Sequence, residues 1–330
     1  MKQRLQQLLK NNKLSRIDKV HSKEKTRKFL LGSREKDGLL HKILVYALLI
    51  CIGFVYLYPL LYMISNSFMT LEDLLDTSIS WIPSKLNIDN YRQAAISMNY
   101  FKSLLHSAVV AGVPTLINVL ICSLVGYGFA RFDFRGKKIF MGILIFSFIL
   151  PPQITMMPTY VLYSDMGITG TLWSFILPAL AGQGLNAPIF ILIFYQFFKQ
   201  VPKVLIEASK IDGAGYLQSF IRIALPSAVP AIITVLLFSF VWYWNESYLT
   251  QLYVSGVFVK GGWSTLIVRL KSFDVNYGNA LATVDGITTS NNESIRMAAT
   301  MLSILPVLLI YFVLQRYFVE SIDRTGITGE

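Results

Sequence analysis

Charged residues are scarce in this chain and missing altogether from six long stretches. Only 15% of the 330 residues are Asp, Glu, Lys or Arg, whereas 54% are apolar, which excludes an ordinary soluble domain. Each uncharged stretch has about 20 residues or more, enough for a helix to cross the roughly 30 Å of hydrocarbon in a bilayer. Lipid offers no partner to an unpaired backbone amide, so helices are the expected spanning form. The sequence therefore predicts an all-α membrane protein with six transmembrane helices, at about 43–65, 103–130, 139–164, 170–198, 223–245 and 297–315.

Two further absences narrow the function. The predicted spans lack Asp, Glu, Lys and Arg, and an ion-coupled carrier normally needs an ionisable relay within its spans. The chain also lacks a G-x-x-x-x-G-K-[ST] phosphate loop, so we expect it to bind no ATP or other cofactor and to catalyse no covalent chemistry. The two cysteines, Cys51 and Cys122, lie inside apolar stretches and are expected to be core residues, not a disulfide.

Basic residues are abundant but unevenly placed. Residues 1–42 contain 13 Lys and Arg, and Arg131–Lys138 contains four more. The positive-inside rule assigns such segments to the cytoplasm, so we expect both termini there. The chain then divides into a basic arm at 1–42, a six-helix membrane domain at 43–318 and a cytoplasmic tail at 319–330. This asymmetry explains the net charge of +11 without nucleic acid, and the arm is expected to be solvated near anionic lipid.

Prolines and uncharged polar side chains recur within the predicted spans. Pro151–Pro152 falls near the middle of the third span, and an interior proline removes a backbone donor and bends a helix. The freed carbonyls must face protein or a water-filled cavity. One interpretation is a path for a neutral, hydroxyl-rich solute, and the other is helix packing alone. The residues expected along such a path are Asn118, Gln153, Gln183, Asn186, Trp242, Tyr243 and Asn245, although the aromatic ones also fit an interfacial belt.

A polar stretch separates the fourth and fifth spans. Pro202 can begin a helix, Asp212–Gly213 interrupts it, and a second short helix leads to Leu225–Pro226. This pattern predicts a helix–turn–helix at 202–222 on the cytoplasmic surface, with apolar side chains exposed. Such side chains indicate either a docking site for a partner or an amphipathic helix lying in the lipid headgroups.

The same stretch resembles the EAA motif of ABC importer permeases. The residues that carry the similarity are Glu207, Ala208, Ser209, Asp212, Gly213, Ala214, Leu225 and Pro226. Ser209 departs from the motif, where a third alanine is usual. The tail Leu314–Glu330, together with Tyr58–Pro59 and Trp244–Asn245, is similar to the maltose-type carbohydrate permeases of this family.

The resemblance implies a type I ABC importer permease, located in a bacterial plasma membrane, that moves a sugar or oligosaccharide. It implies that 202–222 is a coupling helix seated in a separate ATPase, with Glu207 paired to a basic group and Gly213 allowing close backbone approach. The expected partners are a second homologous permease chain, two ATP-binding subunits that use ATP and Mg²⁺, and an extracellular binding protein. The loop 247–296 would reach that binding protein or cap the pore. The alternatives are a permease for another solute and an ion-coupled carrier.

Overall fold

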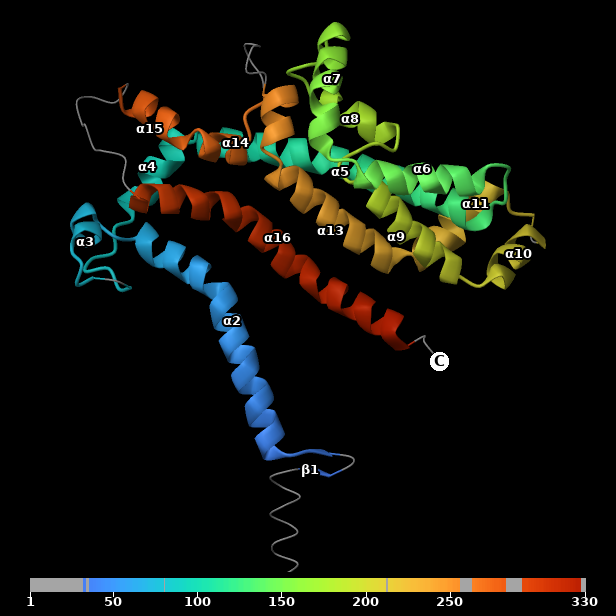
Figure 1. Cartoon of the computed structure of the whole chain (residues 1–330), viewed down its shortest axis with the longest axis horizontal. Helices are drawn as coiled ribbons and strands as arrows, with labels where there is room; N and C mark the ends of the chain where they lie inside the picture. Colours follow the sequence, from blue (N-terminus) through green and yellow to red (C-terminus); the bar gives the residue numbers. More distant parts are fainter. Residues whose placement is uncertain are drawn as a thin grey trace, which may run out of the picture. The chain divides into compact units, whose positions relative to one another are not determined.

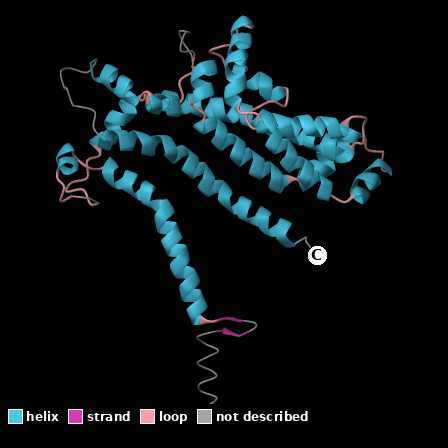
Figure 2. Cartoon of the chain, viewed as in Figure 1, coloured by secondary structure: helices cyan, strands magenta, loops and turns pink. Residues whose placement is uncertain are grey.

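The computed structural model of the chain describes residues 32–33, 36–79, 81–211, 213–255, 263–282 and 293–327. They belong to two compact units, one up to Ser65 and the other from Asn66 onward. Within the described residues the regular structure is helical (Figure 2), apart from two antiparallel strands of two residues each, β1 (Gly32–Ser33) and β2 (Lys36–Asp37). The prediction of an all-α protein is confirmed for this part of the chain.

The described residues of the first unit form the strand pair and one long helix. Helix α2 runs from Leu39 to Ser67, and its 29 residues give a length of about 43 Å at 1.5 Å per residue. It contains the first predicted span, 43–65, with Pro59 inside the helix. Its length and apolar composition are sufficient to cross a membrane.

Helix α5 is the central element of the second unit (Figure 1). It runs from Tyr100 to Arg131 and contacts α9 (Ala187–Gln200) and α13 (Val229–Asn245). Helix α13 also contacts α16 (Glu293–Ile327), which packs in turn against α4 (Asp89–Ser97). The second and sixth predicted spans, 103–130 and 297–315, lie within α5 and α16.

The third and fifth predicted spans are bent. Helices α6 (Lys137–Ile149) and α7 (Pro152–Asp165) meet at 96°, and the helical run Tyr216–Ser227 meets α13 at 79°. The first bend falls at Pro151–Pro152, where an extended Pro151 precedes a proline in the first turn of α7. Within the described residues, three helices can cross a membrane by length and composition, or five segments if each bent pair is one span.

The fourth predicted span, 170–198, is interrupted. Helix α8 (Trp173–Leu180) and α9 occupy its two halves, and residues 181–186 form a turn between them. Gly182 and Asn186 both adopt left-handed backbone conformations there, with φ of +72° and +55°. Such conformations end a right-handed helix, so an apolar stretch predicted as one helix folds as two.

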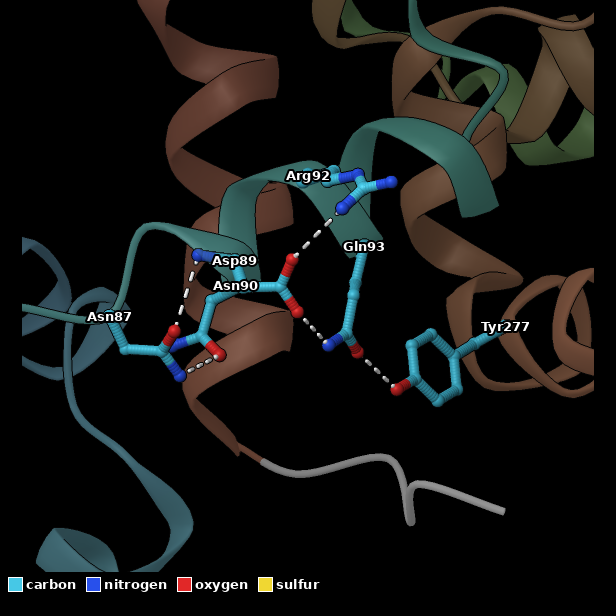
Figure 3. A network of polar contacts seen from close by, with 6 residues as sticks. All are labelled: Asn87, Asp89, Asn90, Arg92, Gln93 and Tyr277. Atoms are coloured by element: carbon cyan, nitrogen blue, oxygen red, sulfur yellow. Dashed lines mark hydrogen bonds and ion pairs between the residues drawn. The ribbon is translucent and has the colours of Figure 1, made fainter. Parts of the chain in front are cut away.

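Short helices occupy the segments between the long ones. They are α3 (Leu71–Leu75), the π-helical turn η2 (Thr250–Val254), α14 (Leu266–Lys271) and α15 (Phe273–Ala282). Helix α15 is joined to α4 by a polar network (Figure 3), in which Tyr277 donates its hydroxyl hydrogen to Gln93 (2.8 Å) and Gln93 donates to Asp89 (2.6 Å). The predicted loop 247–296 is therefore largely helical where it is described, and 256–262 and 283–292 lie outside the described residues.

Gly126 sets the close approach of α5 and α9. A Cβ atom at this position would lie 2.6 Å from the Cβ of Phe194 and 3.0 Å from the carbonyl oxygen of Ile191. No real Cβ tolerates such contacts, so the two helices can lie this close only with glycine here. Gly128, one half-turn later on the same helix, has nothing within 4 Å of the equivalent position.

We predict that Gly126→Ala destabilises the protein by about 1–3 kcal/mol, because it overpacks the α5–α9 contact. Gly128→Ala is the matched control and is expected to be neutral or stabilising by up to about 1 kcal/mol, since alanine favours a helix interior. Thermal unfolding of the purified variants in detergent measures both. Equal melting temperatures for the two variants would contradict the assignment of Gly126.

Candidate functional site

A cavity of about 510 Å³ lies where the helices break. Its wall combines the end of α6, one side of α7, α8 with the turn that leads to α9, one residue of α13 and the segment around η2. The wall therefore depends on irregular backbone, which inside a membrane is tolerated where it is buried in protein or lines a cavity. Its polar side chains are hydroxyls and amides, from Ser147, Thr155, Thr159, Tyr163, Ser174, Gln183, Asn186, Tyr243 and Tyr253.

The turn that forms one side of the cavity is held by two helices. The backbone N–H of Leu185 donates to the hydroxyl of Tyr243 (3.0 Å), and the Leu185 carbonyl accepts from the Asn118 amide (3.2 Å). Asn118 also donates to Ser239 Oγ at 3.2 Å. A Cβ on Gly184 would lie 2.7 Å from Asn118 Oδ1, so glycine is required for this approach. Side chains of α5 and α13 thus satisfy backbone groups that a continuous helix would have satisfied itself.

The seven residues predicted along a path take different positions. Gln183, Asn186 and Tyr243 line the cavity. Asn118 is fully buried and supports the wall from behind. Trp242 packs on Phe190 with ring centroids 5.3 Å apart, and the remaining two, Gln153 and Asn245, are exposed at the start of α7 and the end of α13.

The sequence analysis missed the hydroxyls of Thr155, Thr159, Tyr163, Ser174 and Tyr253. Each stands alone in an apolar segment, so no motif marks it. The prolines at 151–152 and the glycines at 182 and 184 could have indicated the cavity, because such residues mark where helices end. Side chains from several segments can meet at these ends and form a wall.

A second candidate site is the α10–α11 hairpin, which comprises α10 (Lys203–Ile211), the turn at 213–215 and α11 (Tyr216–Ser219). Ser209 is buried, and its hydroxyl lies 2.8 Å from the Ser219 hydroxyl and donates to the Ile206 carbonyl. The Ala214 N–H donates to the Ser209 carbonyl at 2.9 Å. The serine that departs from the EAA pattern therefore joins the two short helices, a bond that alanine could not make.

Gly213 forms the exposed turn of the hairpin. Its φ of +83° lies in the left-handed region that favours glycine, and no atom lies within 4 Å of a Cβ built there. Glu207, Ala208 and Pro226 are also exposed, while Ala214 and Leu225 are partly buried. Asp212 lies outside the described residues. Exposed apolar side chains flank this turn, namely Val204, Ile211 and Leu217.

Aromatic contacts attach the hairpin to the end of α5. The ring of Tyr216 lies 5.1 Å from that of Phe132, and the ring of Phe220 lies 5.0 Å from that of Tyr127. Arg131 donates to the carbonyl of Val201, just before α10, at 2.5 Å. These contacts connect the hairpin to α5, whose Asn118 holds the cavity turn.

A smaller cavity, of about 430 Å³, lies between the hairpin and the helix ends. Glu207 lines it together with three basic side chains, Arg131, Lys137 and Lys199. Lys137 also forms an ion pair with Asp133 at 3.1 Å. The sequence analysis placed the partner of Glu207 on another chain, and these nearby basic groups of its own chain were not anticipated.

Comparison with known families identifies the class. The model of the family described as "Binding-protein-dependent transport system inner membrane component" matches residues 119–324, more than half of the chain. The chain therefore belongs to this family of ABC transporter permeases, which are transport subunits without enzymatic activity whose ATPase is a separate chain. The predicted resemblance to ABC importer permeases is confirmed, as are membrane embedding and the need for ATPase and binding-protein partners.

Several curated relatives carry names from carbohydrate transport. The "Polygalacturonan/rhamnogalacturonan transport system permease protein YtcP" of Bacillus subtilis is 28% identical over 88% of this chain and 99% of its own length. The "Arabinooligosaccharides transport system permease protein AraQ" of Halalkalibacterium halodurans is 28% identical over 84% and 93%. The "Melibiose/raffinose/stachyose import permease protein MelC" of Bacillus subtilis is 26% identical over 77% and 86%.

A solved structure shares the fold. It belongs to a bacterial ABC transporter involved in the import of the acidic polysaccharide alginate, and it matches with a TM-score of 0.69 at 22% identity. The match covers 87% of this chain and 98% of that chain. The helix breaks and the hairpin thus occur within a permease fold already known for ABC importers.

We predict that Tyr243→Phe lowers stability by about 1–3 kcal/mol, because it leaves the Leu185 N–H without its acceptor. Tyr248→Phe is the control, since Tyr248 is 63% exposed and its ring is retained. Thermal unfolding in detergent compares them, and an unchanged melting temperature for Tyr243→Phe would show that the turn does not depend on this bond.

Proposed function

We propose that this chain is the membrane permease subunit of an ATP-driven, binding-protein-dependent importer that carries a sugar or oligosaccharide into the cytoplasm. Family membership supports the importer class. The relatives named for arabinooligosaccharides, for melibiose, raffinose and stachyose, and for polygalacturonan and rhamnogalacturonan support the carbohydrate branch. The observation that carries the proposal is the cavity lined by hydroxyls and amides, because such groups match a hydroxyl-rich solute.

The proposed topology has six membrane crossings and both termini in the cytoplasm of a bacterial cell. The basic residues at 1–42 and at Arg131–Lys138 support this orientation. The fourth crossing would be made by α8 and α9 together, with their turn inside the membrane. In this arrangement the α10–α11 hairpin faces the cytoplasm, and 43–318 forms the permease domain between the arm and the tail 319–330.

The proposed assembly contains a second, homologous permease chain, two ATP-binding subunits and an extracellular binding protein. The exposed Gly213 turn, with its flanking apolar residues, supports docking of the hairpin into an ATP-binding subunit. Glu207 is exposed beside the turn and is the proposed ion-pair partner of that subunit. ATP and Mg²⁺ would be bound by the ATPase and not by this chain. This chain would contact membrane lipid and would not bind nucleic acid.

The proposed coupling runs from the hairpin to the cavity. When ATP binding draws the two ATPase subunits together, each hairpin moves with the subunit that holds it. The contacts of Tyr216 and Phe220 with the end of α5 pass that movement to α5. Asn118 then passes it to the turn at Leu185, which alters the wall of the cavity. The chain thus changes access to the solute without reacting with it.

Purification of the tagged chain from native membranes in mild detergent, with every co-purifying chain identified by mass, tests this function. We expect an ATP-binding subunit and a second permease. A chain that purified alone, and whose solute flux followed a proton or sodium gradient, would contradict the proposal.

We predict that Gly213→Trp abolishes ATP-dependent transport and releases the ATPase from the purified complex, because the indole ring blocks docking. Gly167→Trp is the matched control, since Gly167 also has a positive φ (+68°), has nothing within 4 Å of a built Cβ and lines neither cavity. Glu207→Ala should reduce transport by only a few-fold, because an exposed ion pair contributes about 0–1 kcal/mol. Retention of the ATPase by Gly213→Trp would refute the docking surface.

A further inference from the structure

Among the described residues, no charged side chain lines the larger cavity. The 18 described residues that line it are apolar, aromatic, hydroxyl-bearing or amide-bearing. The chain does place basic side chains around a cavity elsewhere, with Arg131, Lys137 and Lys199 beside the hairpin. The lack of charge is thus a property of the larger cavity and not of the whole chain.

The carboxylate of Glu246 places a negative charge beside the cavity wall. Leu249 lines the cavity, and its backbone N–H donates to the carboxylate of Glu246 at 2.9 Å. The same carboxylate accepts from the N–H of Tyr248 at 2.7 Å, so it is fixed in place. A carboxylate on a solute would be repelled by Glu246. Among the described residues of the wall it would find no cation to replace the water that it loses.

The groups that are present suit an uncharged glycan. Two aromatic pairs, Tyr163 with Tyr253 and Phe175 with Tyr243, have ring centroids 5.3 and 5.5 Å apart and form a largely buried apolar part of the wall. Gln183 is exposed in the cavity and provides both donors and an acceptor for sugar hydroxyls. A volume of about 510 Å³ falls within the range of about 300–1,000 Å³ typical of ligand pockets.

From this wall we infer that the transported solute is a neutral saccharide, not a uronate-containing oligosaccharide. The inference rests on the proposed function and narrows its substrate class. It separates this chain from the relative named for polygalacturonan and from the structural neighbour involved in alginate import, since both of those polymers are acidic. It agrees with the relatives named for arabinooligosaccharides and for melibiose, raffinose and stachyose, which are neutral.

The test uses the complete transporter, with both permease chains, the ATPase and its binding protein, reconstituted in proteoliposomes with ATP on the ATPase side. Labelled neutral oligosaccharides (arabino-, galacto- and gluco-series) and labelled oligogalacturonate are supplied on the other side. We expect at least one neutral saccharide to accumulate in an ATP-dependent manner. Oligogalacturonate should accumulate no more with ATP than in ATP-free vesicles. Accumulation of oligogalacturonate would overturn the inference while leaving ATP-driven sugar import intact. Accumulation of neither class would overturn the proposed function and the inference with it.

A pair of variants connects the result to the cavity. Gln183→Leu removes the amide from the wall and is expected to lower kcat/KM for the neutral saccharide by about threefold to tenfold, the loss expected for one hydrogen bond. Gln196→Leu is the matched control, because Gln196 is an exposed glutamine on α9 outside the cavity wall. Equal transport by the two variants would show that the solute does not contact this wall.

Discussion

Buried backbone groups that leave a helix must find partners within the protein, and this constraint organises the structure around Leu185. In the proposed topology lipid could not supply those partners, and each unpaired group would be costly. The Leu185 N–H and carbonyl are instead bound by Tyr243 of α13 and Asn118 of α5. The break between α8 and α9 therefore requires both neighbouring helices to be in place. Supported in this way, the irregular backbone at 181–186 forms one side of the cavity.

Helix α5 connects this position with the hairpin. Its end contacts Tyr216 and Phe220, its middle carries Gly126 against α9, and Asn118 reaches the turn. A transport subunit that performs no chemistry of its own must convert a partner's movement into a change of access. One helix that contacts both the cavity wall and the hairpin proposed to dock on the ATPase would provide a continuous physical connection for that conversion.

The sequence was sufficient to predict the helical class and the hairpin, but not the cavity. A segment that crosses a bilayer must be apolar along its whole length, so its composition can be recognised in the sequence. The residues of the hairpin are contiguous, so they too form a local pattern. The cavity is assembled from five separate segments, and no local pattern records which side chains meet. Asn118 illustrates the limit: its residue type suggested a place along a solute path, whereas the structure shows it fully buried and bonded to Leu185. The break at 181–186 was missed because an apolar composition predicts that a segment is buried in protein or lipid. It does not predict the backbone conformation of that segment.

The glycine contact between α5 and α9 has a consequence for how the cavity can open and close. Because a backbone approach this close leaves no room for sliding, α5 and α9 would move as one rigid body. Rotation of that body relative to α8 must then be absorbed by the turn at 181–186, where Gly182 and Asn186 already hold left-handed conformations. The turn would act as a hinge, and the solute would lie directly against it. The part of the protein that senses the sugar and the part that bends to release it would then be the same few residues.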